Sequence, residues 1–292
     1  MPILVNIFKT LRPNQWTKNF FIFAGLVFSL KFFNPWFLYK VIEAFLVFCA
    51  LASSVYIIND LADVAGDRLH PKKKFRPIAS GALSPPLALT IALLLIIGSL
   101  AAAFYLDLAF ALVAVTYLVL MICYTFWLRS IVILDVFTIA LGFVLRAIAG
   151  VVVIGVVLSP WLIICTLLLS LFIALGKRRH ELITLASAAS HRKILDEYNP
   201  QLLDQLISIS AGATIVSYAL YSLWPDTVAK FQTQNLIYTL PFVVYGIFRY
   251  LYLIYKKERG GRPEMILLTD FPLILGLLLW VVTAGALLYW AR

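Results

Sequence analysis

Runs of about 20 apolar residues recur along the whole chain, and a membrane-spanning α-helix needs about that length. Of the 292 residues, 63% are hydrophobic and 13% are charged, whereas soluble domains are about 45–50% apolar and about 25% charged. A membrane β-barrel would show short segments of alternating polarity instead, and the sequence has none. The sequence therefore predicts an all-α polytopic membrane protein.

Nine transmembrane helices in one bundle are predicted. Their ranges are 17–34, 38–58, 86–106, 108–127, 131–155, 160–176, 203–224, 235–256 and 271–290. Prolines at or near several of these boundaries support the division, because a missing N–H costs least at a helix end. No linker divides the chain, so a single domain over residues 1–292 is expected. Residues 1–16 have apolar side chains at helical spacing and are predicted to form an amphipathic lead-in on the membrane surface.

Lysines and arginines are distributed unevenly between the predicted loops. The loops on the side of the N-terminus carry 18 of them, and those on the opposite side carry four. Loops rich in lysine and arginine usually face the cytoplasm. The N-terminus is therefore predicted to be cytoplasmic and the C-terminus to lie outside the cell. The predicted location of the protein is the inner (plasma) membrane. The net charge of +10 follows from this distribution and does not indicate nucleic-acid binding. The sequence leaves open whether the protein forms a homo-oligomer.

The stretch 59–84 lies between two apolar runs and begins with three carboxylates. On a helix, Asp60, Asp63 and Asp67 fall on one face, with Asn59 beside Asp63. Carboxylates so placed repel each other unless a positive group lies between them, and Mg²⁺ prefers oxygen ligands completed by substrate phosphates. These four residues are therefore predicted to hold Mg²⁺. The alternative, a solvated loop whose lysines only fix the topology, leaves the acidic face unexplained.

Two groups of cations are candidates for binding an anionic substrate. In the first, Arg76 suits a bidentate grip on phosphate, while Lys72, Lys73 and Lys74 would act as point charges. The second group follows the sixth predicted helix and contains Lys177, Arg178, Arg179 and the carboxylate Glu181. It is predicted to form a second phosphate-binding wall facing the first loop. Its alternative role is to fix the topology through positive charge alone.

A third candidate element runs from the end of the fourth predicted helix into the fifth. It contains Tyr124, Arg129 and Asp135, and Arg146 follows within the fifth helix. A charge inside a membrane helix is costly and usually pairs with another group in the bundle interior. A cavity holding an anionic ligand would supply a partner for Arg146, and structural pairing with another helix is the alternative.

Several of these motifs resemble those of a known family. The run Asn59-Asp60-x-x-Asp63-x-x-x-Asp67, with Arg76-Pro77-x-x-Ser80-Gly81 after it, is similar to the first signature of the UbiA superfamily of intramembrane prenyltransferases. The segment 11–19, which includes Lys18, and the segments 70–79, 134–135, 145–150 and 176–178 resemble the decaprenyl-phosphate phosphoribosyltransferase branch of that superfamily. Where most members carry a second aspartate-rich motif, this chain has one carboxylate and several cations at 177–181.

The resemblance implies transfer of 5-phosphoribose from phosphoribosyl pyrophosphate to a polyprenyl (decaprenyl) phosphate, with release of diphosphate. Asp60, Asp63 and Asp67 would then be catalytic, with Mg²⁺ neutralising the leaving group. The basic and polar residues named above, including Lys18, would bind substrate. The product would serve cell-wall arabinan synthesis.

Two other functions compete with this interpretation. An ordinary prenyltransferase, moving a prenyl group from a prenyl diphosphate to an aromatic acceptor, would use the same metal site. The basic character of 177–181 favours the phosphoribosyl reaction over it. A transporter would tend to show internal repeats and broken helices at the bilayer midplane, whereas the polar residues of this chain gather at one predicted face.

Overall fold

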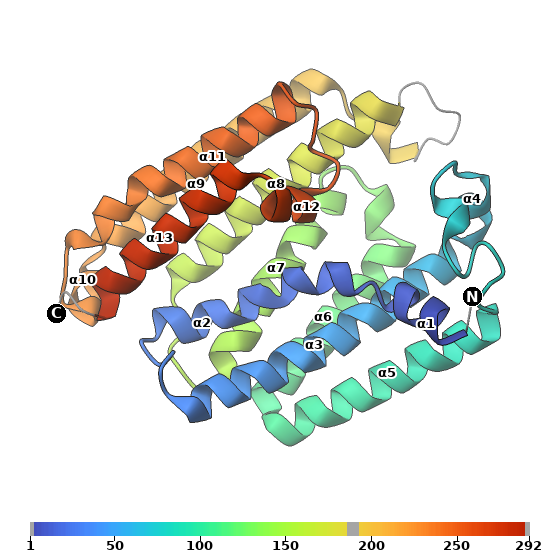
Figure 1. Cartoon of the computed structure of the whole chain (residues 1–292), viewed down its shortest axis with the longest axis horizontal. Coiled ribbons are helices and arrows are strands. Elements are labelled where there is room, and N and C mark those ends of the chain that lie inside the picture. Colours follow the sequence, from blue (N-terminus) through green and yellow to red (C-terminus); the bar gives the residue numbers. More distant parts are fainter. Residues whose placement is uncertain (1–2, 186–192, 290–292) are drawn as a thin grey trace. The chain divides into compact units, whose positions relative to one another are not determined.

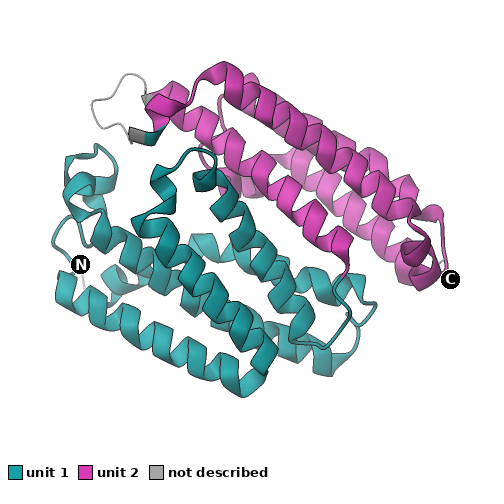
Figure 2. Cartoon of the chain, turned by 180° about the vertical axis from the view of Figure 1, so that it is seen from behind, with its two compact units in different colours: residues 1–158, 188–194 teal, residues 159–187, 195–292 magenta. Residues whose placement is uncertain are grey.

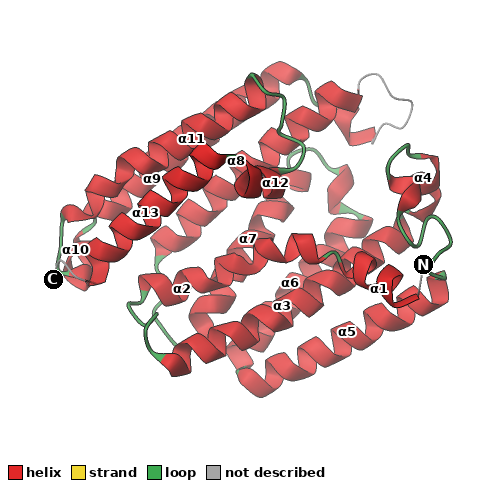
Figure 3. Ribbon diagram, viewed as in Figure 1, coloured by secondary structure: helices red, strands yellow, loops and turns green. Residues whose placement is uncertain are grey.

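The computed structural model describes residues 3–185 and 193–289. Parts of the predicted lead-in, of the 177–202 connection and of the last helix fall in 1–2, 186–192 and 290–292, and these parts lie outside the described residues. Within the described ranges every regular element is helical and none is a strand (Figure 3). The all-α prediction is therefore confirmed.

The chain divides into two compact units, and residues 1–158 with 188–194 form the first (Figure 2). Its elements are the α-helices α1 (Ile3–Leu11), α2 (Phe23–Phe28), α3 (Pro35–Ala62), α4 (Val64–Leu69), α5 (Pro85–Leu106), α6 (Leu108–Phe126) and α7 (Leu134–Val152), and the 3₁₀ helices η1 (Pro13–Ile22), η2 (Lys73–Phe75) and η3 (Leu128–Ser130). In this unit α3 packs against α5, and α6 against α7 (Figure 1).

Residues 159–187 and 195–292 form the second unit. Its α-helices are α8 (Pro160–Leu185), α9 (Pro200–Leu223), α10 (Pro225–Phe231), α11 (Leu240–Tyr255), α12 (Pro263–Thr269) and α13 (Phe271–Tyr289), with the 3₁₀ helix η5 (Asn235–Thr239) before α11. The 3₁₀ helix η4 (Lys193–Glu197) lies where the chain passes from one unit to the other. Here α8 packs against α9, and α11 against α13. The single domain over 1–292 stays a prediction.

Eight helices in the described chain are long and apolar enough to cross a membrane. They are α3, α5, α6, α7, α8, α9, the η5–α11 segment and α13, and they correspond to eight of the nine predicted spans. The protein is therefore a multi-pass membrane protein. The predicted positions of the two termini on opposite sides of the membrane stay a prediction.

The predicted spanning helix 17–34 is not confirmed as a regular α-helix. This part of the chain is the 3₁₀ helix η1 followed by the short helix α2, which ends at Phe28. Polar side chains of η1 bond to α3: the indole Nε1 of Trp16 donates to Ser53 Oγ at 3.0 Å, and Asn19 Nδ2 donates to Cys49 Sγ at 3.2 Å. These bonds hold a tightly wound segment against its neighbour, and the apolar pattern alone could not reveal them.

Helix starts follow local signals that the sequence makes visible. Pro35, Pro85, Pro160 and Pro225 each open a helix, where the missing N–H would have no partner in any case. Asn34 caps α3 by accepting from the amide of Trp36 at 3.0 Å. The proline boundaries predicted from the sequence are thus confirmed.

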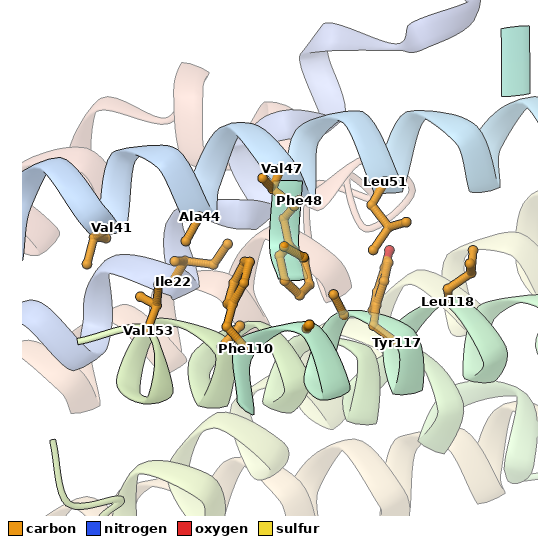
Figure 4. Close-up of a cluster of buried hydrophobic side chains, with 14 of the residues drawn as sticks. Ile22, Val41, Ala44, Val47, Phe48, Leu51, Phe110, Tyr117, Leu118 and Val153 are labelled. Carbon is orange, nitrogen blue, oxygen red and sulfur yellow. The ribbon is translucent and has the colours of Figure 1, made fainter. Parts of the chain in front are cut away.

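The core of the first unit lies between α3 and α6, with contributions from η1 and α7 (Figure 4). The ring of Phe48 packs against Phe110 and Tyr117, with ring centroids 5.8 and 5.3 Å away. Between membrane helices such rings stabilise the bundle through close van der Waals packing, because lipid tails are as apolar as the core. The core in this way holds α3, whose last turn carries the candidate site.

Candidate functional site

The acidic stretch lies where α3 ends. The helix reaches Ala62 and stops at Asp63, whose φ and ψ are −97° and 4°, and α4 begins at Val64. Asp60 therefore sits in the last turn of a membrane-spanning helix, while Asp67 belongs to a separate short helix. The expectation that all three carboxylates lie on one face of a single helix is wrong, because the helix is interrupted at Asp63.

Asp60 and Asp67 share one cation. The guanidinium nitrogen Nη1 of Arg76 lies 3.0 Å from Oδ1 of Asp60 and 2.6 Å from Oδ2 of Asp67. Both carboxylates are buried, with side chains 4% exposed, whereas the Arg76 side chain is 28% exposed. The ammonium of Lys73 lies 3.9 Å from Oδ1 of Asp67 and adds a longer ion pair. Arg76 thus places a positive charge between these two carboxylates.

Arg12 contributes a second guanidinium to the same site. Its Nη2 donates to Oδ1 of Asp60, and its Cζ lies 5.2 Å from the ring centroid of Tyr56. The backbone of Arg12 is left-handed, with φ 53° and ψ 59°, a conformation that costs a residue with a Cβ about 1–3 kcal/mol. Pro13 follows it and disfavours a continued right-handed helix, so the chain turns at Arg12 and directs its side chain to Asp60.

Asp63 has a different partner. Its Oδ1 accepts from Nη1 of Arg129 at 2.7 Å, and Arg129 lies in η3 between α6 and α7. The side chains of the pair are 26% and 27% exposed, more open than the carboxylates of Asp60 and Asp67. Arg129, predicted from the sequence to bind substrate, is thus brought directly to the acidic stretch.

The segment that carries Arg76 is anchored by buried apolar residues. Ile78 and Leu83 are each 1% exposed and join the apolar cluster of Ile57, Ala88 and Ala92. The turn closes when the amide of Ser80 donates to the Arg76 carbonyl at 2.9 Å, and Gly81 follows with φ +80°. Since a residue with a Cβ rarely adopts that φ, glycine is needed here. The backbone of Arg76 is fixed as a result.

The predicted metal ligands fit Mg²⁺ in chemical type. Carboxylate oxygens are the ligands that this ion prefers, and Asp60 and Asp67 approach each other closely enough to contact one nitrogen. Within the described chain, however, no three His, Cys, Asp or Glu side chains are grouped so that they could hold a metal ion. Asp63 is engaged by Arg129 instead, and Asn59 is half-buried in the last turn of α3. Asp60 and Asp67 are therefore the pair best placed to hold one.

The second basic group, at 177–181, lies on α8 and not in a loop beyond it, because α8 continues to Leu185. Arg178 is buried, and its Nη1 donates to Oε2 of Glu181 at 2.7 Å. Nε of Arg179 donates to Oδ1 of Asp204, and its Cζ lies 4.2 Å from the ring centroid of Tyr255. Lys177 is half-buried. This group belongs to the second unit, so its predicted place opposite the acidic stretch stays a prediction.

Arg146 is buried in the first unit and bonds to neutral groups. Nε donates to Oδ1 of Asn19 at 2.7 Å, Nη1 to the carbonyl of Gly142 at 2.7 Å, and Nη2 to the hydroxyl of Tyr117 at 2.8 Å. Structural pairing between η1, α6 and α7 therefore accounts for its burial. The role of Arg146 in substrate binding stays a prediction.

The remaining candidates lie at or near element ends of the first unit. Tyr124 is buried near the end of α6, and Asp135 is fully buried in the first turn of α7. Lys18 is half-buried in η1, and Lys72 is exposed next to η2. The amides of Lys72 and Lys73 donate to Nδ1 of His70, at 3.1 and 3.2 Å, and this ring holds the basic loop in shape.

Arg12 is the site residue that sequence reasoning missed. Its charge counts among the 18 on the side of the N-terminus, because it precedes the first apolar run, and it predicts topology alone. The segment 11–19 that contains it resembles the family branch, and the proline after it marks a turn, but neither gives a direction for the side chain. Only the fold brings Arg12 to a residue 48 positions later.

Comparison with known proteins extends these observations. Residues 19–267 match the model of the UbiA prenyltransferase family. The decaprenyl-phosphate phosphoribosyltransferase of Mycolicibacterium smegmatis is 34% identical over an alignment of 301 positions, gaps included, which covers 99% of this chain and 94% of that protein. The enzyme of the same name from Corynebacterium glutamicum is 36% identical over 282 residues, 94% of this chain and 83% of that protein.

Solved structures share the fold. A UbiA homolog from Archaeoglobus fulgidus bound to GPP and Mg²⁺ superposes with a TM-score of 0.74 at 18% identity, over 97% of this chain and 99% of that one. A UbiA homolog from the same organism bound to Cd²⁺ gives a TM-score of 0.68 at 16% identity, over the same shares of the two chains. The likeness extends over nearly the whole chain, as the sequence motifs predicted.

Proposed function

The chain belongs to the UbiA prenyltransferase family, and we propose that it transfers 5-phosphoribose from phosphoribosyl pyrophosphate to a polyprenyl phosphate such as decaprenyl phosphate. The observation that carries this proposal is the 34–36% identity to decaprenyl-phosphate phosphoribosyltransferases over 94–99% of the chain. Membership of a transferase family also favours an enzyme over a transporter. The product would be a precursor for cell-wall arabinan.

In the proposed reaction the bond between the anomeric carbon of the ribose and the diphosphate oxygen breaks, and its electron pair leaves with the diphosphate. An oxygen of the acceptor phosphate forms the new bond to that carbon. The acceptor phosphate is ionised at neutral pH, so it needs to be oriented more than it needs a general base. Lys and Arg side chains suit that task.

Asp60, Asp67 and Asp63, with Asn59 beside them, are proposed to hold Mg²⁺. When bound, the ion would neutralise charge on the leaving diphosphate. Arg76, Arg129, Lys72 and Lys73 are proposed to hold substrate phosphate around it, and the contacts of Arg76 and Arg129 with the carboxylates support this placement. The proposed roles of Lys18, Tyr124, Asp135, Arg146, Lys177, Arg178, Arg179 and Glu181 are in substrate binding.

The protein is proposed to lie in the inner (plasma) membrane, with its active site facing the cytoplasm. The uneven distribution of lysine and arginine supports this orientation. The outward apolar face of α1 suits a helix on the membrane surface, since Leu4 is 74% and Phe8 59% exposed while Asn6 and Thr10 are buried. Efficient labelling of a Lys73→Cys variant by an impermeant reagent outside intact cells would contradict the cytoplasmic orientation of the site.

The family name keeps an ordinary prenyltransferase as the alternative. The test is to give the purified protein two substrate pairs with Mg²⁺. One pair is phosphoribosyl pyrophosphate with decaprenyl phosphate, and the other is a prenyl diphosphate with an aromatic acid. The proposal predicts a lipid-linked phosphoribose product from the first pair only. Product from the second pair alone would favour the alternative.

A further inference from the structure

The arginines at Asp60 and Asp67 lie where a cation of another kind is expected. We propose that Arg76, assisted by Arg12, takes the place of the divalent cation while the site is empty and turns to the anionic substrate when the cation binds. The inference rests on the proposed function in taking Mg²⁺ as the resident ion. It adds that these two guanidiniums compete with Mg²⁺ for the same carboxylates.

The competition follows from the position of one atom. Nη1 of Arg76 contacts an oxygen of Asp60 and an oxygen of Asp67 at hydrogen-bond distance. A divalent ion held by the same two oxygens would approach each of them to about 2.0–2.1 Å. It would therefore occupy the space of that nitrogen, and two cations cannot share it.

Burial indicates which partner moves. The carboxylates of Asp60 and Asp67 are almost completely buried, at 4% exposed, while the side chains of Arg12 and Arg76 are 27% and 28% exposed. Asp60 also lies in the last turn of the long helix α3. The carboxylates are thus fixed within the protein, and the guanidiniums reach them from the open side.

The backbones of both arginines are held in place, so the change is confined to side chains. Arg12 lies at the turn between α1 and η1, where the Gln15 amide donates to its carbonyl at 2.8 Å. Arg76 precedes the turn that the buried side chains of Ile78 and Leu83 anchor. A long, flexible side chain on a fixed backbone can exchange one anionic partner for another without refolding the site.

The substrate supplies the second partner. A guanidinium binds carboxylate and phosphate with the same planar fork, so diphosphate is a suitable acceptor for Arg76 and Arg12 once the cation holds Asp60 and Asp67. Each ligand then makes room for the other, and their binding must be mutually favourable. Mg²⁺ should bind weakly to the protein alone and more tightly with diphosphate present.

The test is a calorimetric titration of the purified protein with Mg²⁺, with and without inorganic pyrophosphate. In Arg76→Gln, Mg²⁺ should bind about 10- to 150-fold more tightly without pyrophosphate, which is the equivalent of one lost charge-assisted hydrogen bond. Pyrophosphate should bind the same variant more weakly in the presence of Mg²⁺. Arg12→Gln should change both affinities in the same directions by a smaller factor, and it serves if Arg76→Gln does not fold.

Arg68→Gln is the matched control. Arg68 is exposed on α4, and its Nε donates to the carbonyl of Ala79 at 3.3 Å, so its removal changes the net charge equally without opening the carboxylates. Its Mg²⁺ affinity should change less than threefold. Unchanged or weaker Mg²⁺ binding in both Arg76→Gln and Arg12→Gln would overturn the inference, as would the absence of Mg²⁺ binding in every variant. If either result were found in a protein that still transfers phosphoribose normally, the inference would fail and the proposed function would stand.

Discussion

Nη1 of Arg129 lies 2.7 Å from Oδ1 of Asp63, and this ion pair joins two residues 66 positions apart. Asp63 ends α3, and Arg129 lies in η3, between α6 and α7. The contact brings a cation from a distant connection to the acidic stretch. Both side chains are about a quarter exposed, so both remain open to a ligand.

Asp63→Asn is expected to abolish turnover while leaving the protein folded. A partly exposed ion pair contributes about 0–1 kcal/mol to stability, whereas a lost carboxylate would weaken cation binding in the site. Turnover with phosphoribosyl pyrophosphate and the thermal unfolding midpoint in detergent measure the two effects. Asp107→Asn is the control, because asparagine caps a helix as well as aspartate and Asp107 only caps α6. Near-normal turnover of Asp63→Asn at limiting Mg²⁺ would exclude Asp63 from the site.

Gly150→Ala is expected to disrupt the packing of η1 on α7. A Cβ at this position would lie 1.8 Å from the carbonyl oxygen of Ile22, which is backbone and cannot move aside cheaply. The variant should lose folded protein or lower the unfolding midpoint by several degrees. Gly98→Ala in α5 is the matched control, since its Cβ would meet nothing within 4 Å and alanine favours a helix by about 0.8–1 kcal/mol. Equal stability of the two variants would contradict this packing.

The sequence was sufficient for eight of the nine expected membrane helices. Apolar length predicted eight of the spans, because a bilayer imposes that length on any helix that crosses it. The η1 segment could not be predicted in the same way. Its winding depends on bonds from Trp16 and Asn19 to α3, and periodicity within the segment does not record them.

The arginine partners of the three carboxylates could not be predicted from the sequence either. Spacing predicted three aspartates on one face, but the structure interrupts the helix at Asp63 and brings arginines to them from three separate segments. Ile133, before α7, has φ 69°, which is strained for a β-branched residue. Tertiary packing decides such features, and no local signal announces them.

Arg178→Ala is expected to lower kcat/KM for phosphoribosyl pyrophosphate by about 10- to 150-fold, since a charge-assisted phosphate contact is worth about 1.5–3 kcal/mol. Arg178→Lys should restore only part of the loss, because an ammonium lacks the planar fork. Arg179→Ala should lower both kcat/KM and stability, since Arg179 also bonds to Asp204 within its own unit. Losses below about threefold for alanine at 177, 178 and 179, measured at saturating Mg²⁺, would remove this group from substrate binding.

His70 is expected to make the basic loop sensitive to acid. Burial, followed by the nearby Lys73, lowers the pKa of this histidine below its usual value of about 6.5. The unfolded chain therefore takes up the proton first. The stabilising contribution of His70 is complete above about pH 6.5 and is lost as the pH falls towards the lower folded pKa. Protonation of Nδ1 also removes the acceptor for the amides of Lys72 and Lys73.

The unfolding midpoints of the natural protein and of His70→Gln, each at pH 7.5 and pH 5.5, measure this effect. Other titrating groups are common to both proteins, so the difference isolates His70. The natural protein should lose more stability on acidification than the variant. An equal or greater loss in His70→Gln would show that this ring does not hold the loop in a pH-dependent way.

The transfer reaction itself tests the proposed function most directly. Ribose-labelled phosphoribosyl pyrophosphate and decaprenyl phosphate are given to the purified protein in detergent. Label should enter the lipid phase, and diphosphate should be released in equal amount. Both should require Mg²⁺, and both should be absent in Asp60→Asn. Label in the lipid phase at the same rate in Asp60→Asn, or no label there from the natural protein with Mg²⁺, would contradict the proposed function.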